Sequence, residues 1–186
     1  MPSRGSCMSP ESTEPARRLF FALWPRARVR EELEQAAVAV LGKRVRRIRA
    51  QNLHLTLAFA GPVPPATHRC LVAAAAAVQS APFALVLDRI GHWPRPRILW
   101  AGPQHTPPEL WSLVGHLREV LADCGIPPET RPYQAHITLA RKLGRPPPVS
   151  EIEPIHWSIS QFSLVESVTD PAGVRYQILE TWELEG

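Results

Sequence analysis

The sequence of 186 residues has little cysteine, almost no lysine and no long apolar run. Its cysteines, Cys7, Cys70 and Cys124, are too few, too widely spaced and odd in number for a disulfide framework or a zinc cluster, so we expect a reducing compartment. No apolar run is long enough to span a bilayer, and the chain does not open with the apolar segment of a signal peptide. We therefore expect a cytoplasmic protein without membrane contact.

Basic residues are abundant, but among the 21 only Lys43 and Lys142 are lysines. The planar guanidinium of arginine suits phosphate, which favours a partner that carries phosphate, although a compositional bias explains the same excess equally well. Five of the seven residues from Lys43 to Arg49 are basic. This run is a candidate for contact with an RNA backbone, but short basic runs are more often simply solvated.

The 21 prolines argue against helical bundles and coiled coils, because proline ends helices. Residues 1–16 are rich in proline and serine, so we expect a disordered leader there and one domain over residues 17–186. The apolar periodicity of that domain is typical of an α+β fold with antiparallel sheets backed by helices. The expected strands are 18–24, 53–59, 83–90, 98–101, 135–140, 157–165 and 174–184, and the expected helices are 27–41, 66–79 and 107–123.

One pattern occurs twice in the sequence, 82 residues apart, as His54-Leu-Thr-Leu-Ala and His136-Ile-Thr-Leu-Ala. Each copy lies in a predicted strand, where side chains two residues apart share a face. His54 therefore lies beside Thr56, and His136 lies beside Thr138, on the face opposite the leucines. If a pseudo-twofold axis relates the two halves of the chain, both polar faces meet at one groove.

Two histidines can move two protons in one displacement, because one imidazole accepts a proton while the other donates one. Cleavage of a phosphodiester needs both transfers, on opposite sides of phosphorus, with hydroxyl groups and cations to stabilise the non-bridging oxygens. The alternative interpretation is a duplicated repeat that preserves only strand packing. A metal site is less favoured, since no carboxylate stands at ligand spacing from either histidine, and we expect no cofactor.

These residues resemble the two-histidine phosphoesterases, specifically the RNA 2′,3′-cyclic phosphodiesterases formerly described as 2′-5′ RNA ligases. The resemblance extends from Arg18 to Leu184. It is carried by residues 18–25, 52–59 with Gly61, 93–97, 99–100 and 136–141. Two positions depart from the family pattern, because Ala50 and Ala135 stand where a proline often precedes each motif, which bears on the geometry of the loops.

The resemblance implies a bilobal α+β fold with a pseudo-twofold axis, in which two antiparallel sheets flank a central cleft and the helices lie on the outside. It also implies metal-independent opening of a terminal RNA 2′,3′-cyclic phosphate to a 2′-phosphomonoester. Carried over to this chain, His54 is the proton donor, His136 is the proton acceptor, and Thr56 and Thr138 bind phosphate oxygens. The symmetry of the two motifs alone would allow the histidines to exchange roles.

Four further residues are candidates for substrate binding. Arg141 contacts phosphate by the resemblance, although strict alternation from Thr138 places it on the opposite face of the strand. Arg131 and Tyr133 precede the second motif and could contact the cleft, but they are more readily explained as surface or packing residues. Phe59 is a candidate for stacking on a base, or else a core residue.

Three functions compete. The first is hydrolysis of RNA that ends in a 2′,3′-cyclic phosphate, with tRNA halves among the candidate substrates and a monomer as the expected state. The second is the same chemistry on a small nucleotide cyclic phosphate, or reversible 2′-5′ RNA ligation. The third is a non-catalytic RNA-binding or nucleotide-binding module, which is disfavoured because binding alone does not require two proton-transfer groups.

Overall fold

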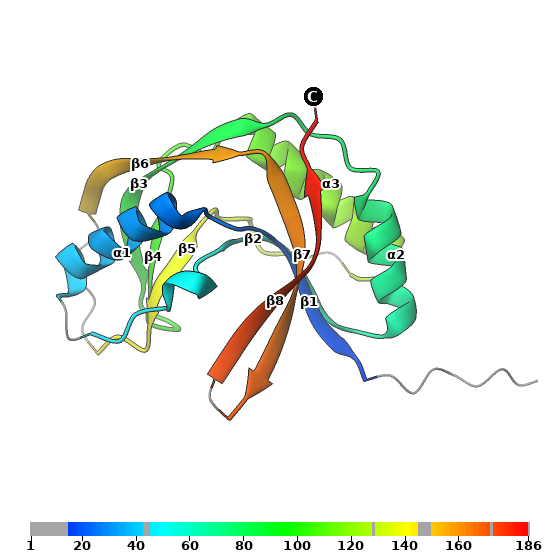
Figure 1. Cartoon of the computed structure of the whole chain (residues 1–186), viewed down its shortest axis with the longest axis horizontal. Helices are drawn as coiled ribbons and strands as arrows, with labels where there is room; N and C mark the ends of the chain where they lie inside the picture. Colours follow the sequence, from blue (N-terminus) through cyan, green and yellow to red (C-terminus); the bar gives the residue numbers. More distant parts are fainter. Residues whose placement is uncertain (1–14, 43–44, 128, 145–149, 172, 186) are drawn as a thin grey trace, which may run out of the picture.

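The computed structural model describes residues 15–42, 45–127, 129–144, 150–171 and 173–185, and within them it has the mixed α+β composition predicted from the sequence (Figure 1). The elements are β1 (Arg17–Leu23), α1 (Ala27–Leu41), a 3₁₀ turn η1 (Ala50–Asn52), β2 (Leu55–Val63), α2 (Pro65–Ala75), β3 (Phe83–Trp93), β4 (Ile98–Gly102), α3 (Pro108–Asp123), β5 (Ile137–Arg141), β6 (Ser150–Ile159), β7 (Gln161–Asp170) and β8 (Gly173–Glu183).

The strands of the described chain form one antiparallel sheet in the order β6-β3-β4-β5-β2-β1-β7-β8. The motif strands β2 and β5 are neighbours at its centre, where the register joins Leu55 to Ile137. The family resemblance implied two sheets. The strands instead form one, because the two motif strands pair with each other. We call β2, β1, β7 and β8 the His54 half, and β5, β4, β3 and β6 the His136 half.

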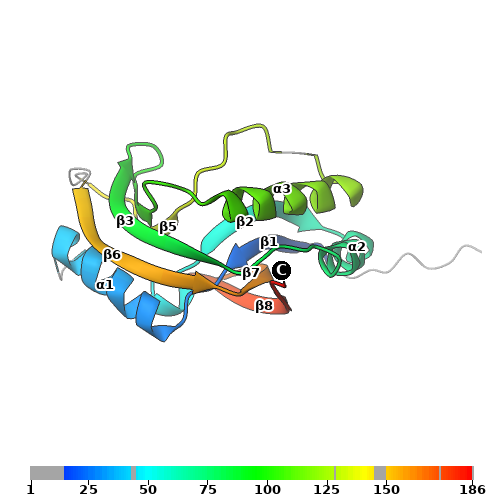
Figure 2. The same ribbon diagram turned by 90° about the horizontal axis from the view of Figure 1, so that it is seen from above.

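Helices α1 and α3 each cover the half of the sheet to which the preceding strand does not belong (Figures 1 and 2). Helix α1 follows β1 in the chain but contacts β5 and β6 of the His136 half. Helix α3 follows β4 but contacts β2 of the His54 half, and α2 packs against α3. Each motif strand is therefore supported by a helix that follows a strand of the other half, which ties the two halves together.

The main core lies between the sheet and the helices, and α3 shows how the sequence builds it. The apolar residues of this helix recur at the helical spacing predicted from the sequence, and all of them are buried. They are Leu110, Leu113, Val114, Leu117, Val120 and Leu121. On the opposite face of the sheet Phe20, Ala22 and Val165 form a second, smaller cluster. Residues 19–23 of β1 are consequently buried on both faces, as their continuous apolar run predicts.

The C-terminal strands differ from the prediction, which placed one strand over residues 157–165. The structure ends β6 at Ile159 and begins β7 at Gln161. Strand β6 pairs with β3, whereas β7 pairs with β1 and β8. The chain must bend at this point because it crosses from the His136 half to the His54 half. Pro154 is tolerated within β6, since β6 is an edge strand of the sheet.

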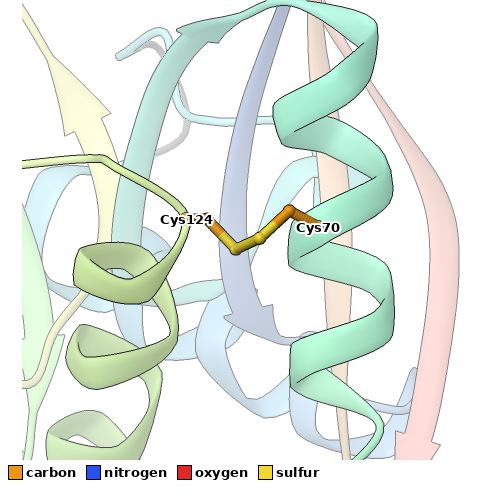
Figure 3. Close-up of a disulfide and its surroundings, with 2 residues drawn as sticks. All are labelled: Cys70 and Cys124. Carbon is orange, nitrogen blue, oxygen red and sulfur yellow. A yellow bond between two sulfur atoms is a disulfide. The ribbon is translucent and has the colours of Figure 1, made fainter.

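The cysteines also correct the prediction, because Cys70 and Cys124 form a disulfide (Figure 3). Cys70 lies on α2 and Cys124 caps the C-terminal end of α3, with Cα atoms 5.8 Å apart. A separation of 54 residues made them appear distant in sequence, but the packing of α2 on α3 brings them together. The cross-link therefore joins two helices on the His54 half.

Some residues named in the sequence analysis lie outside the part of the chain that the structure describes. Cys7, Lys43 and nearly all of the predicted leader over residues 1–16 lie outside the described residues. Within the described residues, none of the helices combines the length and the apolar character needed to cross a bilayer.

Candidate active site

The two motif histidines lie immediately before the two central strands. His54 precedes Leu55 and His136 precedes Ile137, and these two strand residues are register partners. Antiparallel pairing thus places the two histidines on neighbouring strands at the middle of the sheet. We call the surface that carries Thr56 and Thr138 the histidine face, and it lies opposite the main core. The convergence predicted from the repeated motif is what the topology produces.

The same backbone hydrogen bond holds each imidazole. His54 Nδ1 lies 2.7 Å from the carbonyl oxygen of Asn52, and His136 Nδ1 lies 2.8 Å from that of Gln134. A carbonyl oxygen can only accept, so Nδ1 carries the hydrogen in each ring. The other nitrogen, Nε2, is then the basic atom of the neutral ring. Two imidazoles with this tautomer are suited to exchange protons with a ligand through Nε2.

A β-bulge follows the threonine in both motifs. The register of β2 with β1 skips Leu57, and the register of β5 with β4 skips Leu139. The bulge puts two successive residues of each strand into the main core, Leu57 with Ala58 and Leu139 with Ala140. The next residue in each strand therefore returns to the histidine face.

Phe59 and Arg141 are those next residues, and both are exposed. Phe59 is the register partner of Phe20, which belongs to the cluster on the histidine face, and Arg141 is the partner of Ile98. The bulge corrects the expectation from strict alternation, which placed Arg141 on the other face. The two motifs thus present an aromatic ring and a guanidinium at equivalent positions. Because β2 and β5 are antiparallel, these two groups lie on opposite sides of the histidines along the strands.

Aromatic rings enclose His54. The Trp24 indole is stacked on its imidazole, with centroids 5.0 Å apart and an interplanar angle of 4°. Tyr176 of β8 meets the imidazole edge-on at 4.7 Å, and Phe20 lies 5.1 Å away. Asn52 Nδ2 donates to the carbonyl oxygen of Val174 at 3.3 Å, which holds the start of β8 against the segment before His54. Sequence reasoning missed all three rings as site residues, since nothing local connects β8 or the β1 segment with the first motif.

His136 has a more open aromatic environment. Trp93 meets its imidazole edge-on at 4.6 Å, and Trp100 lies behind Trp93 at 5.5 Å. The Trp100 indole occupies the space over Gly91, where an added Cβ would lie 2.1 Å from a ring carbon. Only glycine therefore fits at position 91. The register also places Trp100 directly opposite Thr138.

Burial and nearby positive charge lower the pKa of both histidines. Burial lowers the pKa of His54 from 6.5 to about 4, against the opposing effect of its hydrogen bond to Asn52. The charges of Arg141 and His136 lower it further. Burial also lowers the pKa of His136, and Arg141 adds to that effect. Without a ligand both rings are therefore neutral near pH 7, and an anion between them would favour the protonated forms.

The two candidates ahead of the second motif have other contacts. Tyr133 packs against the main core, and its hydroxyl donates to the backbone carbonyl oxygen of Thr56 at 3.2 Å. Burial raises the pKa of this hydroxyl above its usual value, so it remains a donor. Tyr133 thereby ties the loop before β5 to β2. Arg131 is exposed and forms an ion pair with Glu129 at 3.1 Å.

The described residues contain no group of three or more histidine, cysteine, aspartate or glutamate side chains placed to hold a metal ion. The arrangement on the histidine face consists of two imidazoles, two hydroxyls, one guanidinium and one exposed aromatic ring. This set can bind a phosphate group and move protons on two sides of it.

The fold and the paired motifs agree with the two-histidine phosphoesterases, the class that the sequence resembles. Residues 23–171 match the model of the 2′-5′ RNA ligase superfamily. The chain is 35% identical over 174 residues to the RNA 2′,3′-cyclic phosphodiesterase of Escherichia coli K12. The match covers 90% of this chain and 96% of that protein. This chain therefore belongs to the 2′-5′ RNA ligase superfamily.

Solved structures agree with this assignment. The crystal structure of E. coli LigT in its apo form superposes with a TM-score of 0.83 at 31% identity, covering 93% of this chain and 100% of that one. A crystal structure of the same protein with 3′-AMP superposes with a TM-score of 0.82 at 30% identity and the same coverage. The expected α+β fold and the expected family are thus both confirmed.

Proposed function

We propose that this protein hydrolyses the 2′,3′-cyclic phosphate at the end of an RNA to a 2′-phosphomonoester, without a metal ion. The observation that carries this proposal is the matched pair of imidazoles. Each is held through Nδ1, so each has Nε2 available for proton transfer. The names of the relatives support the reaction, because the E. coli protein is an RNA 2′,3′-cyclic phosphodiesterase. The LigT complex with 3′-AMP supports a substrate that contains a ribonucleotide phosphate.

In the proposed reaction His136 accepts a proton from water at Nε2 as the water oxygen attacks phosphorus. The bond from phosphorus to the 3′ oxygen breaks, and that oxygen takes the proton from Nε2 of His54. The product keeps phosphate on the 2′ oxygen. Each turnover leaves His54 neutral and His136 protonated, so the two rings must exchange their proton with solvent or product before the next cycle.

The assignment of His54 as donor comes from the family resemblance, and the aromatic enclosure supports it. A protonated imidazole stacked on the Trp24 indole gains a cation–π interaction. Burial of His54 opposes protonation in the free protein, so the proton must arrive together with the phosphate anion. Because burial lowers its pKa, the protonated ring of His54 gives up its proton readily, as a donor to a leaving oxygen should.

The other candidates take supporting roles. Thr56 and Thr138 donate hydrogen bonds to the non-bridging phosphate oxygens, and Arg141 supplies positive charge there. Phe59 stacks on the base of the terminal nucleotide, since its ring is 51% exposed while its inner side rests on Phe20, with ring centroids 5.4 Å apart. Tyr133 positions the backbone of Thr56 through its hydrogen bond to the carbonyl oxygen. Arg131, with its guanidinium on Glu129, is the weakest candidate for contact with substrate.

The experiment is turnover of an oligoribonucleotide with a 2′,3′-cyclic phosphate end by protein treated with EDTA. We expect full activity and a 2′-phosphate product, identified by chromatography against 2′-phosphate and 3′-phosphate standards. A 3′-phosphate product would contradict the assigned direction of cleavage. Loss of activity in EDTA that is restored by a metal ion would contradict the metal-independent mechanism, and complete inactivity would favour a binding module.

The same reaction mixtures test the second function. Addition of an RNA with a 5′-hydroxyl end measures reversible 2′-5′ ligation, and a nucleoside 2′,3′-cyclic monophosphate measures activity on small nucleotides. Equal kcat/KM on the mononucleotide and the oligomer would favour a small-molecule substrate.

A further inference from the structure

A set of exposed basic side chains gathers beside the second motif from three separate parts of the sequence. They come from the segment after α1, from the turn between β3 and β4, and from the end of β5. We call this set the basic end, and its members are Arg46, Arg49, Arg95, Arg97, Arg141 and Lys142, all of which are exposed.

The backbone register brings these segments together. Arg47 forms an isolated antiparallel bridge with Ala140, and the amide of Ile48 donates to the carbonyl oxygen of Leu139 at 2.8 Å. The segment of residues 45–48 therefore lies along the edge of β5 that β2 leaves free (Figure 1). Continuing this register by one residue places Arg46 opposite Arg141.

The turn before β4 joins the other edge of β5. Ile98 is the register partner of Arg141, and the amide of Leu143 donates to the carbonyl oxygen of Arg97 at 3.3 Å. Arg97 and Lys142 are therefore close neighbours across this pair. Arg141 stands in the middle of the basic end, with one basic segment on each side.

The charges of the basic end are uncompensated in the described part of the chain, where none of the six side chains forms an ion pair with a carboxylate. Like charges on opposed strands destabilise a sheet. Two members also adopt left-handed backbone conformations, with φ of 64° at Arg97 and 58° at Lys142. This conformation favours glycine, yet charged residues occupy both positions. An anionic ligand would offset the repulsion between these like charges.

We propose that the basic end binds the phosphodiester backbone of the RNA on the 5′ side of its cyclic phosphate. This inference rests on the proposed function and adds a binding site for the following nucleotides. The basic end includes Arg141, whose charge already affects both histidines. Phe59 lies beyond the histidines in the opposite direction. A terminal nucleotide with its base on Phe59 therefore directs its 5′ phosphate toward the basic end.

The proposal predicts selectivity for oligomers, because a nucleoside 2′,3′-cyclic monophosphate has no phosphodiester to reach the basic end. The test compares kcat/KM on that mononucleotide with kcat/KM on a short oligoribonucleotide that has the same terminal nucleotide. The variant is Arg46→Gln with Arg97→Gly. Glycine at position 97 suits the positive φ, so this change removes a charge without adding backbone strain.

We expect the double variant to lower kcat/KM for the oligomer about tenfold for each backbone phosphate that it no longer binds, and to leave the mononucleotide rate unchanged. The slope of log kcat/KM for the oligomer against log salt concentration should become shallower by about 0.7 for each such phosphate. An equal loss on both substrates would overturn the proposal, since it would show that the basic end acts only through the terminal nucleotide.

Two matched variants serve as controls. Arg69→Gln removes an exposed arginine from α2, on the helix side of the sheet, and measures the effect of net charge alone. Arg18→Gln removes an exposed arginine of β1, whose register partner Pro62 lies beyond Phe59 on β2. If Arg18→Gln reduces oligomer selectivity and the double variant does not, the RNA runs across the His54 half and the proposal is wrong.

Binding keeps the test separate from the proposed function. If neither substrate is turned over, the proposed function fails, and the basic end is judged by fluorescence anisotropy with a labelled oligoribonucleotide that has an unreactive 3′-hydroxyl end. Weaker binding and a shallower salt dependence in the double variant would support the basic end as an RNA site. Unchanged binding would overturn it.

Discussion

His54 and His136 occupy matching positions in the two halves of the sheet, but their surroundings differ. Both follow a backbone carbonyl that binds Nδ1, and both precede a threonine and a bulge at a leucine. His54 is enclosed by rings from β1 and from the distant strand β8, whereas His136 meets one indole edge-on. In the proposed reaction the repeated geometry supplies the two proton-transfer groups, and the unequal environments make those groups chemically different.

The same contrast extends outward from each motif. The His54 half continues to Phe59, an exposed ring on an apolar cluster, and the His136 half continues to Arg141 within the basic end. A phosphate bound between two symmetric motifs could sit in either orientation. In our proposal the ring on one side and the positive charge on the other give the bound substrate a direction, with the base toward Phe59 and the phosphates toward Arg141.

The largest effect we expect is from removal of either histidine. His54→Ala and His136→Ala should each lower kcat by about 10²-fold to 10⁴-fold, because each removes one proton transfer. Steady-state kinetics on the cyclic-phosphate oligomer measures this, with circular dichroism to verify folding. His105→Ala, in an exposed loop, is the control. Retained activity in one of the two variants would show that the halves are not equal partners in the reaction.

Loss of the disulfide should lower the stability of the protein, because the cross-link holds the two helices of the His54 half together. It should leave the activity unchanged. Closure of a 54-residue loop by Cys70 and Cys124 limits the unfolded chain, so Cys70→Ser with Cys124→Ser should lower the free energy of unfolding by about 2 to 4 kcal/mol. Urea denaturation measures the change, and kcat should not alter. Alkylation of both thiols in native protein purified without reductant would contradict the cross-link.

The next largest effect on activity should come from exchanging Phe59 and Arg141, the two residues that follow the bulges. Arg141→Phe removes a charge-assisted contact with phosphate and should lower kcat/KM about 10-fold to 100-fold. Phe59→Arg removes the stacking surface and should mainly raise KM. The double exchange tests direction: recovery of activity above that of Arg141→Phe alone would mean that the site accepts a reversed substrate, against our interpretation.

The smallest effects we expect are on the pH dependence of activity, where Trp24 beside His54 can be compared with Trp93 beside His136. Both histidine pKa values are lowered, so kcat/KM, which reports the free enzyme, should reach its maximum below pH 6.5. Trp24→Ala exposes His54 to water and should move the corresponding limb of the pH profile upward toward 6.5. Trp93→Ala should move the profile less, because it covers His136 only edge-on. A larger shift from Trp93→Ala would reverse the comparison.

Burial of His54 also couples folding to pH. Its pKa is about 4 in the folded protein and near 6.5 in an exposed chain, so protonation favours the unfolded state. The stability from its neutral form is complete above pH 6.5 and is lost as the pH falls toward 4. In urea titrations across this window, His54→Phe should lose less stability than the parent protein does, and an identical pH dependence would contradict the burial of this ring.

Local patterns in the sequence predicted much of the fold. Apolar periodicity placed α1, α3 and the motif strands within a few residues, and the repeated His-x-Thr pattern predicted that the two polar faces meet. Strict alternation failed at Arg141, because a bulge changes the register and has no signature in the sequence alone. The prediction also missed Tyr176, which reaches His54 only because the β7–β8 pair folds back toward Asn52.

The sequence by itself determined the paired histidines, the threonines beside them and the α+β class, because these follow from the two-residue period of a strand and the spacing of apolar residues on a helix. The tertiary structure alone decided which residues surround each histidine. Contacts between strands far apart in the chain enclose His54, bring Cys70 to Cys124 and gather three basic segments around Arg141. Two cysteines that are far apart in the sequence form a cross-link in the folded chain. Part of the short basic run likewise joins a charged surface that is built from three segments.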